Sequence, residues 1–258
     1  MKETDKEKFW TETQLIHGQF RSKKWDYAHH VIPPRTASTT FRLDSASRGR
    51  QGFVNFADPE ASGRDCPIYV YDRLDEPNCA MLEEILKEAE GGEAAVAFAC
   101  GMAAISAALM VAARSGNNIV AHRTMYGCTY SLMTNWLPRY GVTTRFVMAN
   151  DIEATAAAID GQTRAIYLET PSNPTLECVD LARIRDLLDR VNADRAPDDR
   201  VLLIVDNTFA TSWAQRPISL GADVVVVSLT KNMGGFGVDM GGAVVCPQRL
   251  DLTFRMFR

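Results

Sequence analysis

Apolar and polar residues are distributed differently in two parts of this chain. Over residues 1–60, proline, serine, threonine and arginine are mixed with apolar residues at no regular period, a pattern typical of irregular structure. From about residue 78, short apolar runs alternate with segments whose apolar residues recur every three to four positions. The runs predict buried strands and the periodic segments predict helices. We therefore expect an irregular N-terminal arm at 1–60 and an α/β domain at 61–258.

The regular part predicts helices and strands in alternation. Four segments have the signals of helices: 79–92, 130–141, 151–159 and 180–195. The first ends in two glycines and the third begins with Asp151 as a cap. Six short apolar runs predict strands: 117–123, 142–148, 163–169, 200–207, 222–228 and 241–246. This alternation predicts an open, mostly parallel sheet flanked by helices.

Two apolar segments add to this prediction. Residues 94–113 contain no charged residue, but small residues dominate the segment and Cys100-Gly101 divides it. We interpret it as a short strand or turn followed by a buried helix, rather than as a membrane span. Residues 224–227 are four consecutive valines without polar alternation, which predicts a central strand covered on both faces.

Polar residues gather at the ends of three successive predicted strands. They occupy residues 169–173, 206–208 and 228–231. Ligands of parallel α/β sheets bind at the carboxyl ends of the strands, so the three groups predict a shared site. Turn formation is the alternative explanation for each group taken alone, because Asn, Asp, Ser and Thr also favour turns.

Composition and charge argue against several classes of partner. The 258-residue chain has a formal net charge of -4 and no block of Lys or Arg, which disfavours nucleic acid and anionic membranes. Its six cysteines are scattered without a Cys-x-x-Cys pair, which indicates reduced thiols. The charged start of the sequence lacks the apolar segment of a secretory signal. We expect a cytoplasmic protein.

One cofactor suits the strand-end residues. Pyridoxal phosphate needs a lysine amine, a carboxylate at its pyridinium nitrogen and an anion site for its phosphate. Lys231 would supply the amine and Asp206 the carboxylate. The apolar helix that starts at Gly101 and Met102 would hold the phosphate through free main-chain N–H groups and the positive helix end.

Further contacts to this cofactor are expected from Ser228 and Thr230, while Tyr126 would stack on its ring. Competing motifs fit less well. The glycines after Lys231 lack the G-x-G-x-x-G spacing, because Met240 stands at the third glycine, which disfavours a dinucleotide-binding domain. The four histidines lack metal-ligand spacing, and no metal site is expected.

The sequence resembles the cystathionine gamma-synthase family of pyridoxal-phosphate enzymes of cysteine and methionine metabolism, which includes methionine gamma-lyase. Six motifs carry the resemblance, in the family's order: "YVYDRLDEPN", "ACGMAAI", "MYGCTY", "ETPSNPTLECVD", "VDNTFAT" and "SLTKNMGGFGVDMGG". They span most of the chain after residue 60, and their joint occurrence is highly specific.

The resemblance implies an aminotransferase-like large domain of fold type I and a role for each matching residue. Lys231 would form the Schiff base, and Asp206 would pair with the pyridine nitrogen. Tyr126 would stack on the ring and help to activate the substrate. The other contacts would be made to the phosphate by Gly101, Met102, Ser228 and Thr230, and to the ring oxygen and the aspartate by Asn173 and Thr208.

The resemblance also implies an assembly. Tyr71 and Arg73 resemble the pair that reaches into the neighbouring subunit's phosphate site, so a homotetramer built from dimers with shared active sites is implied. Cys100 departs from the family, since serine is common there, and residues 75–78 replace Gly-Asn-Pro-Thr. The family continues into a small C-terminal domain that carries the arginine for the substrate carboxylate, and we expect this domain to be absent here.

The function implied by the resemblance is that of a carbon–sulfur lyase or transsulfuration enzyme acting at Cγ of sulfur amino acids or O-acylhomoserine. Cys128 resembles methionine gamma-lyase more than the synthases, which favours elimination. Replacement at Cγ, as in cystathionine gamma-synthase or an O-acylhomoserine sulfhydrylase, stays open as an alternative. An inactive truncated fragment that binds the cofactor is the alternative of another class.

Overall fold

The computed structural model describes residues 35–58, 68–235 and 237–258. Its strands form one sheet of seven in the order β1-β7-β6-β5-β4-β2-β3. They are β1 (Ala94–Phe98), β2 (Asn118–His122), β3 (Thr143–Val147), β4 (Thr163–Glu169), β5 (Leu202–Asp206), β6 (Val224–Ser228) and β7 (Gly242–Cys246). β7 is antiparallel to β1 and β6, and the other neighbouring pairs are parallel. The prediction of a mostly parallel sheet is confirmed.

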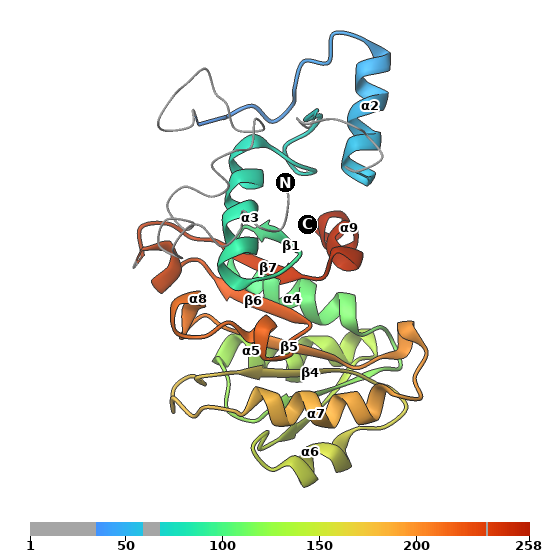
Figure 1. Ribbon diagram of the computed structural model, residues 1–258, viewed down its shortest axis with the longest axis vertical. Coiled ribbons are helices and arrows are strands. Elements are labelled where there is room, and N and C mark those ends of the chain that lie inside the picture. The colour runs from blue at the N-terminus through green and yellow to red at the C-terminus, as the bar shows by residue number, and fades with distance from the viewer. Residues whose placement is uncertain (1–34, 59–67, 236) are drawn as a thin grey trace, which may run out of the picture.

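Helices flank this sheet (Figure 1). The α-helices in the described ranges are α2 (Ala46–Ala57), α3 (Pro77–Glu90), α4 (Gly101–Ala112), α5 (Gly127–Ser131), α6 (Ile152–Ala158), α7 (Leu181–Asn192), α8 (Thr211–Ala214) and α9 (Gln248–Phe257). The predicted helices at 79–92, 151–159 and 180–195 correspond to α3, α6 and α7. The apolar segment 94–113 is divided into β1 and α4, as predicted.

Each face of the sheet has its own hydrophobic core, because successive strand residues point to opposite faces. Val224 and Val226 of β6 pack in one cluster with side chains of α4, whereas Val225 and Val227 pack in the other with side chains of α7. All four valines are at most 2% exposed, and burying such a side chain contributes about 1.5–3 kcal/mol. The missing polar alternation in β6 therefore reflects burial on both faces.

Local signals set the ends of several helices. The Asp151 side chain accepts a hydrogen bond from the Ala154 N–H at 2.9 Å and caps α6, a contact worth about 1 kcal/mol. α3 ends at Gly91, whose φ of 74° is left-handed and favours glycine. The start of α6 and the end of α3 therefore lie where their capping residues predict.

The structure corrects the expectation of an irregular arm for part of residues 1–60. α2 lies within that stretch, and the Ser45 side chain caps it by accepting a hydrogen bond from the Arg48 N–H at 3.1 Å. The helix buries the small or polar residues Gly49, Gly52 and Asn55, so it lacks the apolar periodicity that predicts helices. Residues 1–34 of the expected arm lie outside the described residues.

The structure differs from the predicted elements at two further places. The single helix predicted at 130–141 is a composite, in which α5 is followed by a π-helical turn at Leu132–Trp136 and a 3₁₀ turn at Leu137–Tyr140. Pro138 has no N–H to donate, so a regular α-helix does not continue through it. α9 has no counterpart among the predicted elements. Arg255 anchors it on α3 through an ion pair with Glu83 at 2.8 Å.

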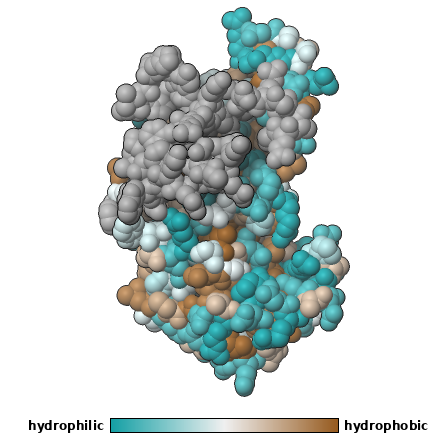
Figure 2. Space-filling view, viewed as in Figure 1, coloured by the Kyte–Doolittle hydropathy of each residue, from teal (hydrophilic) through white to brown (hydrophobic). Residues whose placement is uncertain are grey.

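The surface is mixed in character. Figure 2 shows hydrophilic residues dominating the end where α6 and α7 lie, with apolar residues scattered among them. None of the described helices is long and apolar enough to cross a membrane. The cysteines of the described ranges are all free thiols: Cys79, Cys100, Cys128, Cys178 and Cys246.

Candidate active site

The candidate site lies at the carboxyl ends of β4, β5 and β6. Glu169 of β4 pairs in register with Asp206 of β5, and Ser228 of β6 pairs with Gly242 of β7. Gly242 also pairs with Phe98 at the end of β1, so α4 begins at the same edge of the sheet (Figure 1). The three predicted groups of polar residues therefore share one edge.

The start of α4 lies against the end of β6. A Cβ atom on Gly101 would lie 2.7 Å from the Cβ of Ser228, so a side chain here would require something to shift. The first N–H groups bonded within the helix are those of Ala103 and Ala104, and both donate to the Cys100 carbonyl. The N–H groups of Gly101 and Met102 precede them and point beyond the helix end. Such a helix start suits an anion.

Replacing Gly101 with alanine should destabilise the chain by about 1–3 kcal/mol, the usual result of overpacking a tight contact. The added methyl must displace either Ser228 or the start of α4, and urea unfolding measures the loss. Gly161→Ala is the matched control, because an added Cβ there meets no atom within 4 Å. Equal stability of the two variants would contradict close packing at Gly101.

Asp206 is a buried carboxylate at the end of β5, 8% exposed. Its Oδ1 accepts a hydrogen bond from the Thr208 N–H at 2.9 Å, and its Oδ2 accepts one from the Tyr167 hydroxyl at 3.3 Å. Burial raises the pKa of the Asp206 carboxyl above its ordinary value, whereas the bonds to Thr208 lower it. No cation within the described ranges forms an ion pair with Asp206. A cation bound against this carboxylate would offset the free energy of burying it.

Thr208 links the ends of β5 and β6. Its N–H donates to Asp206, and its hydroxyl oxygen accepts a hydrogen bond from the Ser228 N–H at 2.8 Å. Ser228 lies in turn against Gly101. Four predicted site residues therefore form one continuous group.

Lys231 lies on a turn that follows β6. The two ends of this turn are joined: the Leu229 N–H donates to the Gly241 carbonyl at 2.9 Å, and the Gly241 N–H donates to the Thr230 hydroxyl at 3.2 Å. The Lys231 N–H donates to the Ser228 carbonyl at 3.3 Å, and the residue is exposed. The lysine is thus fixed to the end of β6 by its main chain, with its side chain accessible.

Glu169 joins two predicted site residues that are far apart in the sequence. Its Oε1 accepts a hydrogen bond from the Tyr126 N–H at 2.8 Å, and its Oε2 accepts one from the Asn173 N–H at 3.3 Å. Tyr126 itself is 41% exposed, and a hydrogen bond to Cys128 raises the pKa of its hydroxyl. Sequence reasoning assigns Glu169 no role, because only the strand register shows that it lies opposite Asp206.

Tyr71 and Arg73 lie at the surface before α3. Tyr71 forms an isolated antiparallel bridge with Thr40, and the Arg73 guanidinium lies 5.6 Å from the centre of the Tyr71 ring, a cation–π distance. The Arg73 carbonyl accepts a hydrogen bond from Arg258 Nε at 3.1 Å. Both residues are exposed. Among the described residues, no hydrogen bond or ring contact links this pair to the strand-end group.

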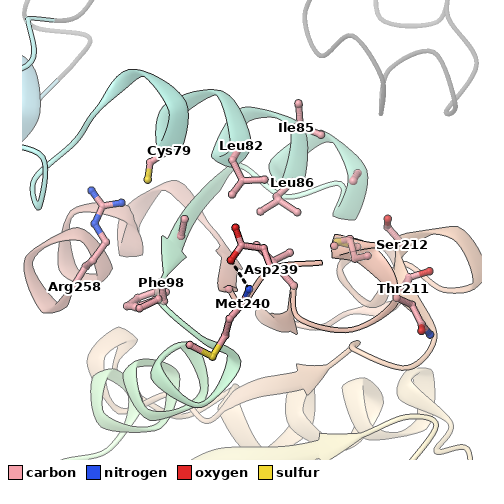
Figure 3. A pocket seen from close by; sticks show the side chains of 18 of the residues that line it. Cys79, Leu82, Ile85, Leu86, Phe98, Thr211, Ser212, Asp239, Met240 and Arg258 are labelled. Carbon is pink, nitrogen blue, oxygen red and sulfur yellow. Dashed lines mark hydrogen bonds between the residues drawn. The ribbon is translucent and has the colours of Figure 1, made fainter. Parts of the chain in front are cut away.

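A cavity of about 820 Å³ lies beside the lysine turn. Figure 3 shows Leu82 and Leu86 of α3 pointing toward Asp239 and Met240 across this cavity. Arg73 is the one predicted site residue among those that line it. The mostly apolar lining suits an apolar group, so the polar strand-end group rather than this cavity is the candidate site for a phosphate.

The strand-end group fits pyridoxal phosphate. The helix start at Gly101 and Met102 would hold the phosphate, with Ser228 beside it. A protonated ring nitrogen beside the buried Asp206 carboxylate would stabilise its negative charge. Lys231 offers an accessible amine on a turn attached to the same strand end as Ser228.

Known proteins are similar to this chain in sequence and fold. The family described as Cys/Met metabolism PLP-dependent enzyme matches residues 12–257. L-methionine gamma-lyase of Fusobacterium nucleatum subsp. polymorphum is 40% identical over 217 residues, which are 84% of this chain and 51% of that protein. Cystathionine gamma-lyase of Bacillus subtilis is 43% identical over 177 residues, or 69% of this chain and 44% of that protein.

A solved structure from Campylobacter jejuni has the same fold, with a TM-score of 0.80 and 29% identity over 95% of this chain and 55% of that one. That protein, provisionally named O-acetylhomoserine (thiol)-lyase, contains N′-pyridoxyl-lysine-5′-monophosphate. The present chain spans about half the length of the curated relatives that it matches.

Proposed function

Because this chain belongs to the family of Cys/Met metabolism PLP-dependent enzymes, we propose that it is a carbon–sulfur lyase acting at Cγ of a sulfur amino acid. One observation carries the proposal. The buried Asp206 carboxylate is linked through Thr208 and Ser228 to the open helix start at Gly101, and Lys231 follows on the adjoining turn. A carboxylate for a ring nitrogen, a helix start for a phosphate and an amine for covalent attachment therefore lie along one edge of the sheet.

Pyridoxal phosphate, when bound, supplies a ring that withdraws electrons from Cα of an amino-acid substrate. Asp206 would keep the proton on the ring nitrogen, and Tyr126 would cover the ring face. Lys231 would attach the cofactor through Nζ and, once released from it, take the proton from the substrate Cα. Asn173 would contact the ring oxygen, and Thr230 would assist Ser228 at the phosphate.

Elimination at Cγ is the reaction we favour. The names of the Fusobacterium and Bacillus relatives both describe gamma-lyases, and Cys128 contacts the Tyr126 hydroxyl. Replacement at Cγ is the second candidate, supported by the name of the Campylobacter protein. Incubation with O-acetylhomoserine, with and without sulfide, separates the two reactions. Elimination releases acetate, ammonia and an α-keto acid, whereas replacement releases acetate and, with sulfide, yields an amino acid that carries a thiol at Cγ.

The cofactor assignment is tested by titrating the chain with pyridoxal phosphate and recording the visible spectrum. We expect a yellow band that borohydride bleaches, with the reduced cofactor located on the Lys231 peptide by mass spectrometry. A chain that gives this band but turns over neither class of substrate would be the cofactor-binding fragment. Absence of the band at saturating cofactor would overturn the proposal.

We also propose a cytoplasmic homotetramer of dimers in which Tyr71 and Arg73 serve the partner's site. Their exposure, and the fact that no hydrogen bond or ring contact among the described residues links them to the strand-end group, support this arrangement. A phosphate in the partner would give Arg73 a charge-assisted contact. Two defective chains, Lys231→Ala and Arg73→Ala, should complement each other. Each mixed dimer contains one site with both defects and one with neither.

The measurement is the covalent label on the Arg73→Ala chain after borohydride reduction at a low cofactor concentration. Mixing with Lys231→Ala under conditions that exchange subunits should increase this label severalfold. Mixing with wild-type chain under the same conditions is the positive control. Sites confined to single chains would give no increase with Lys231→Ala.

A further inference from the structure

Glu169 occupies a position that the proposed roles do not use. It ends β4, is 5% exposed, and lies opposite Asp206 in the register of β4 and β5. Both carboxylate oxygens are engaged, one by the Tyr126 N–H at 2.8 Å and the other by the Asn173 N–H at 3.3 Å. Those two residues belong to different loops, one before α5 and one between β4 and α7.

Burying a charged carboxylate is unfavourable. The N–H groups of Tyr126 and Asn173 stabilise the charge of this one. Burial, and secondarily the neighbouring Asp206, raise the pKa of Glu169 to about 7, while the two main-chain hydrogen bonds lower it. No ion pair with another described residue compensates for its charge. A glutamine of the same shape would avoid the buried charge, but its amide has one acceptor oxygen and its NH₂ group would meet the second N–H.

We propose that Glu169 is a positioning residue that sets the main chain of both Tyr126 and Asn173 relative to Asp206. The inference rests on the proposed function, because it assigns Tyr126 to the ring face and Asn173 to the ring oxygen. Since Glu169 and Asp206 are neighbours on adjacent strands, their separation is fixed by the sheet. Through its two hydrogen bonds, Glu169 therefore fixes the loops of Tyr126 and Asn173 at a set distance from Asp206, the proposed partner of the ring nitrogen.

Three variants separate this role from general stabilisation. Glu169→Ala removes both hydrogen bonds, and Glu169→Gln retains one acceptor. Glu177→Gln is the matched control: it makes the same chemical change on the loop that carries Asn173, but Glu177 accepts its hydrogen bond from Asn150 Nδ2 at 3.0 Å. Unfolding of each cofactor-free chain shows whether the variant is folded before its cofactor is examined.

The two readouts are the dissociation constant of pyridoxal phosphate and the induced circular dichroism of its visible band. We expect Glu169→Ala to weaken binding about tenfold or more, as loss of two charge-assisted contacts predicts. Its visible dichroism should shrink because Tyr126 no longer holds one ring orientation. Glu169→Gln should recover part of both quantities, and Glu177→Gln should resemble wild type.

Each outcome decides the inference. If both Glu169 variants bind the cofactor as wild type does, with unchanged dichroism, the positioning role is wrong and the proposed function stands. The same conclusion follows if Glu169→Gln lowers only the unfolding temperature. A wild-type chain without a borohydride-sensitive band would overturn the proposed function and the inference with it. Should Glu169→Ala not fold, Glu169→Gln alone decides.

Discussion

Lys231→Ala should yield a folded chain that no longer retains pyridoxal phosphate after borohydride reduction. The side chain is exposed and the residue lies outside the buried strand, so its removal should change the free energy of unfolding by no more than about 0.5 kcal/mol. The covalent attachment, in contrast, depends on this one amine. We therefore expect the reducible visible band to disappear completely.

The chain offers a matched control for this experiment. After residue 24 the sequence contains lysine only at positions 87 and 231, and Lys87 pairs with Glu84 on α3. Lys87→Ala should keep the reducible band, whereas a band that survives in Lys231→Ala would assign the attachment to another amine. Peptide mapping of the reduced protein identifies that amine directly.

Asp206→Ala should retain covalent cofactor but lose about 10²–10³-fold in the rate of Cα proton removal, a range typical for deleting one electrostatic contact in an active site. Without this carboxylate the ring nitrogen loses its proton and becomes a poor electron sink. The exchange of the substrate Cα proton for solvent deuterium, followed by NMR, measures that step separately from bond cleavage at Cγ.

Asp223→Ala is the control for Asp206→Ala. Asp223 lies just before β6, at the other end of the strands, and pairs with Arg185 at 3.2 Å. The control should lose some stability while exchanging Cα protons at the wild-type rate. An Asp206→Ala chain that exchanges as fast as wild type would remove Asp206 from the reaction.

Most of the sheet could be predicted because burial leaves a direct record in the sequence. The four valines of β6 are apolar in succession since each face of the strand meets a separate core. α2 leaves no such record, because small or polar residues form its buried side. The composite segment after α5 also escapes a period-based prediction, since π-helical and 3₁₀ turns differ from the spacing of an α-helix.

Part of the candidate site could likewise be predicted from the sequence, and part of it could not. The location of Asp206, Ser228 and Lys231 at one end of the sheet could be predicted, because each follows an apolar run at a strand end. The place of Glu169 between Tyr126 and Asn173 could not be predicted, because its hydrogen bonds to them depend on how two distant loops meet across the sheet. Contacts of that kind belong to the register and the loop geometry, and neither has a period in the sequence.

The joined ends of the lysine turn have a consequence for engineering. Leu229 and Thr230 bond to Gly241, so the position of Lys231 relative to β6 is set at the base of the turn rather than along its length. Loop-closure entropy grows slowly, by about 0.6 kcal/mol for each doubling of loop length. The outer part of the turn, around Val238, which is 78% exposed, is therefore a suitable place to graft a peptide tag or reporter sequence without moving the amine.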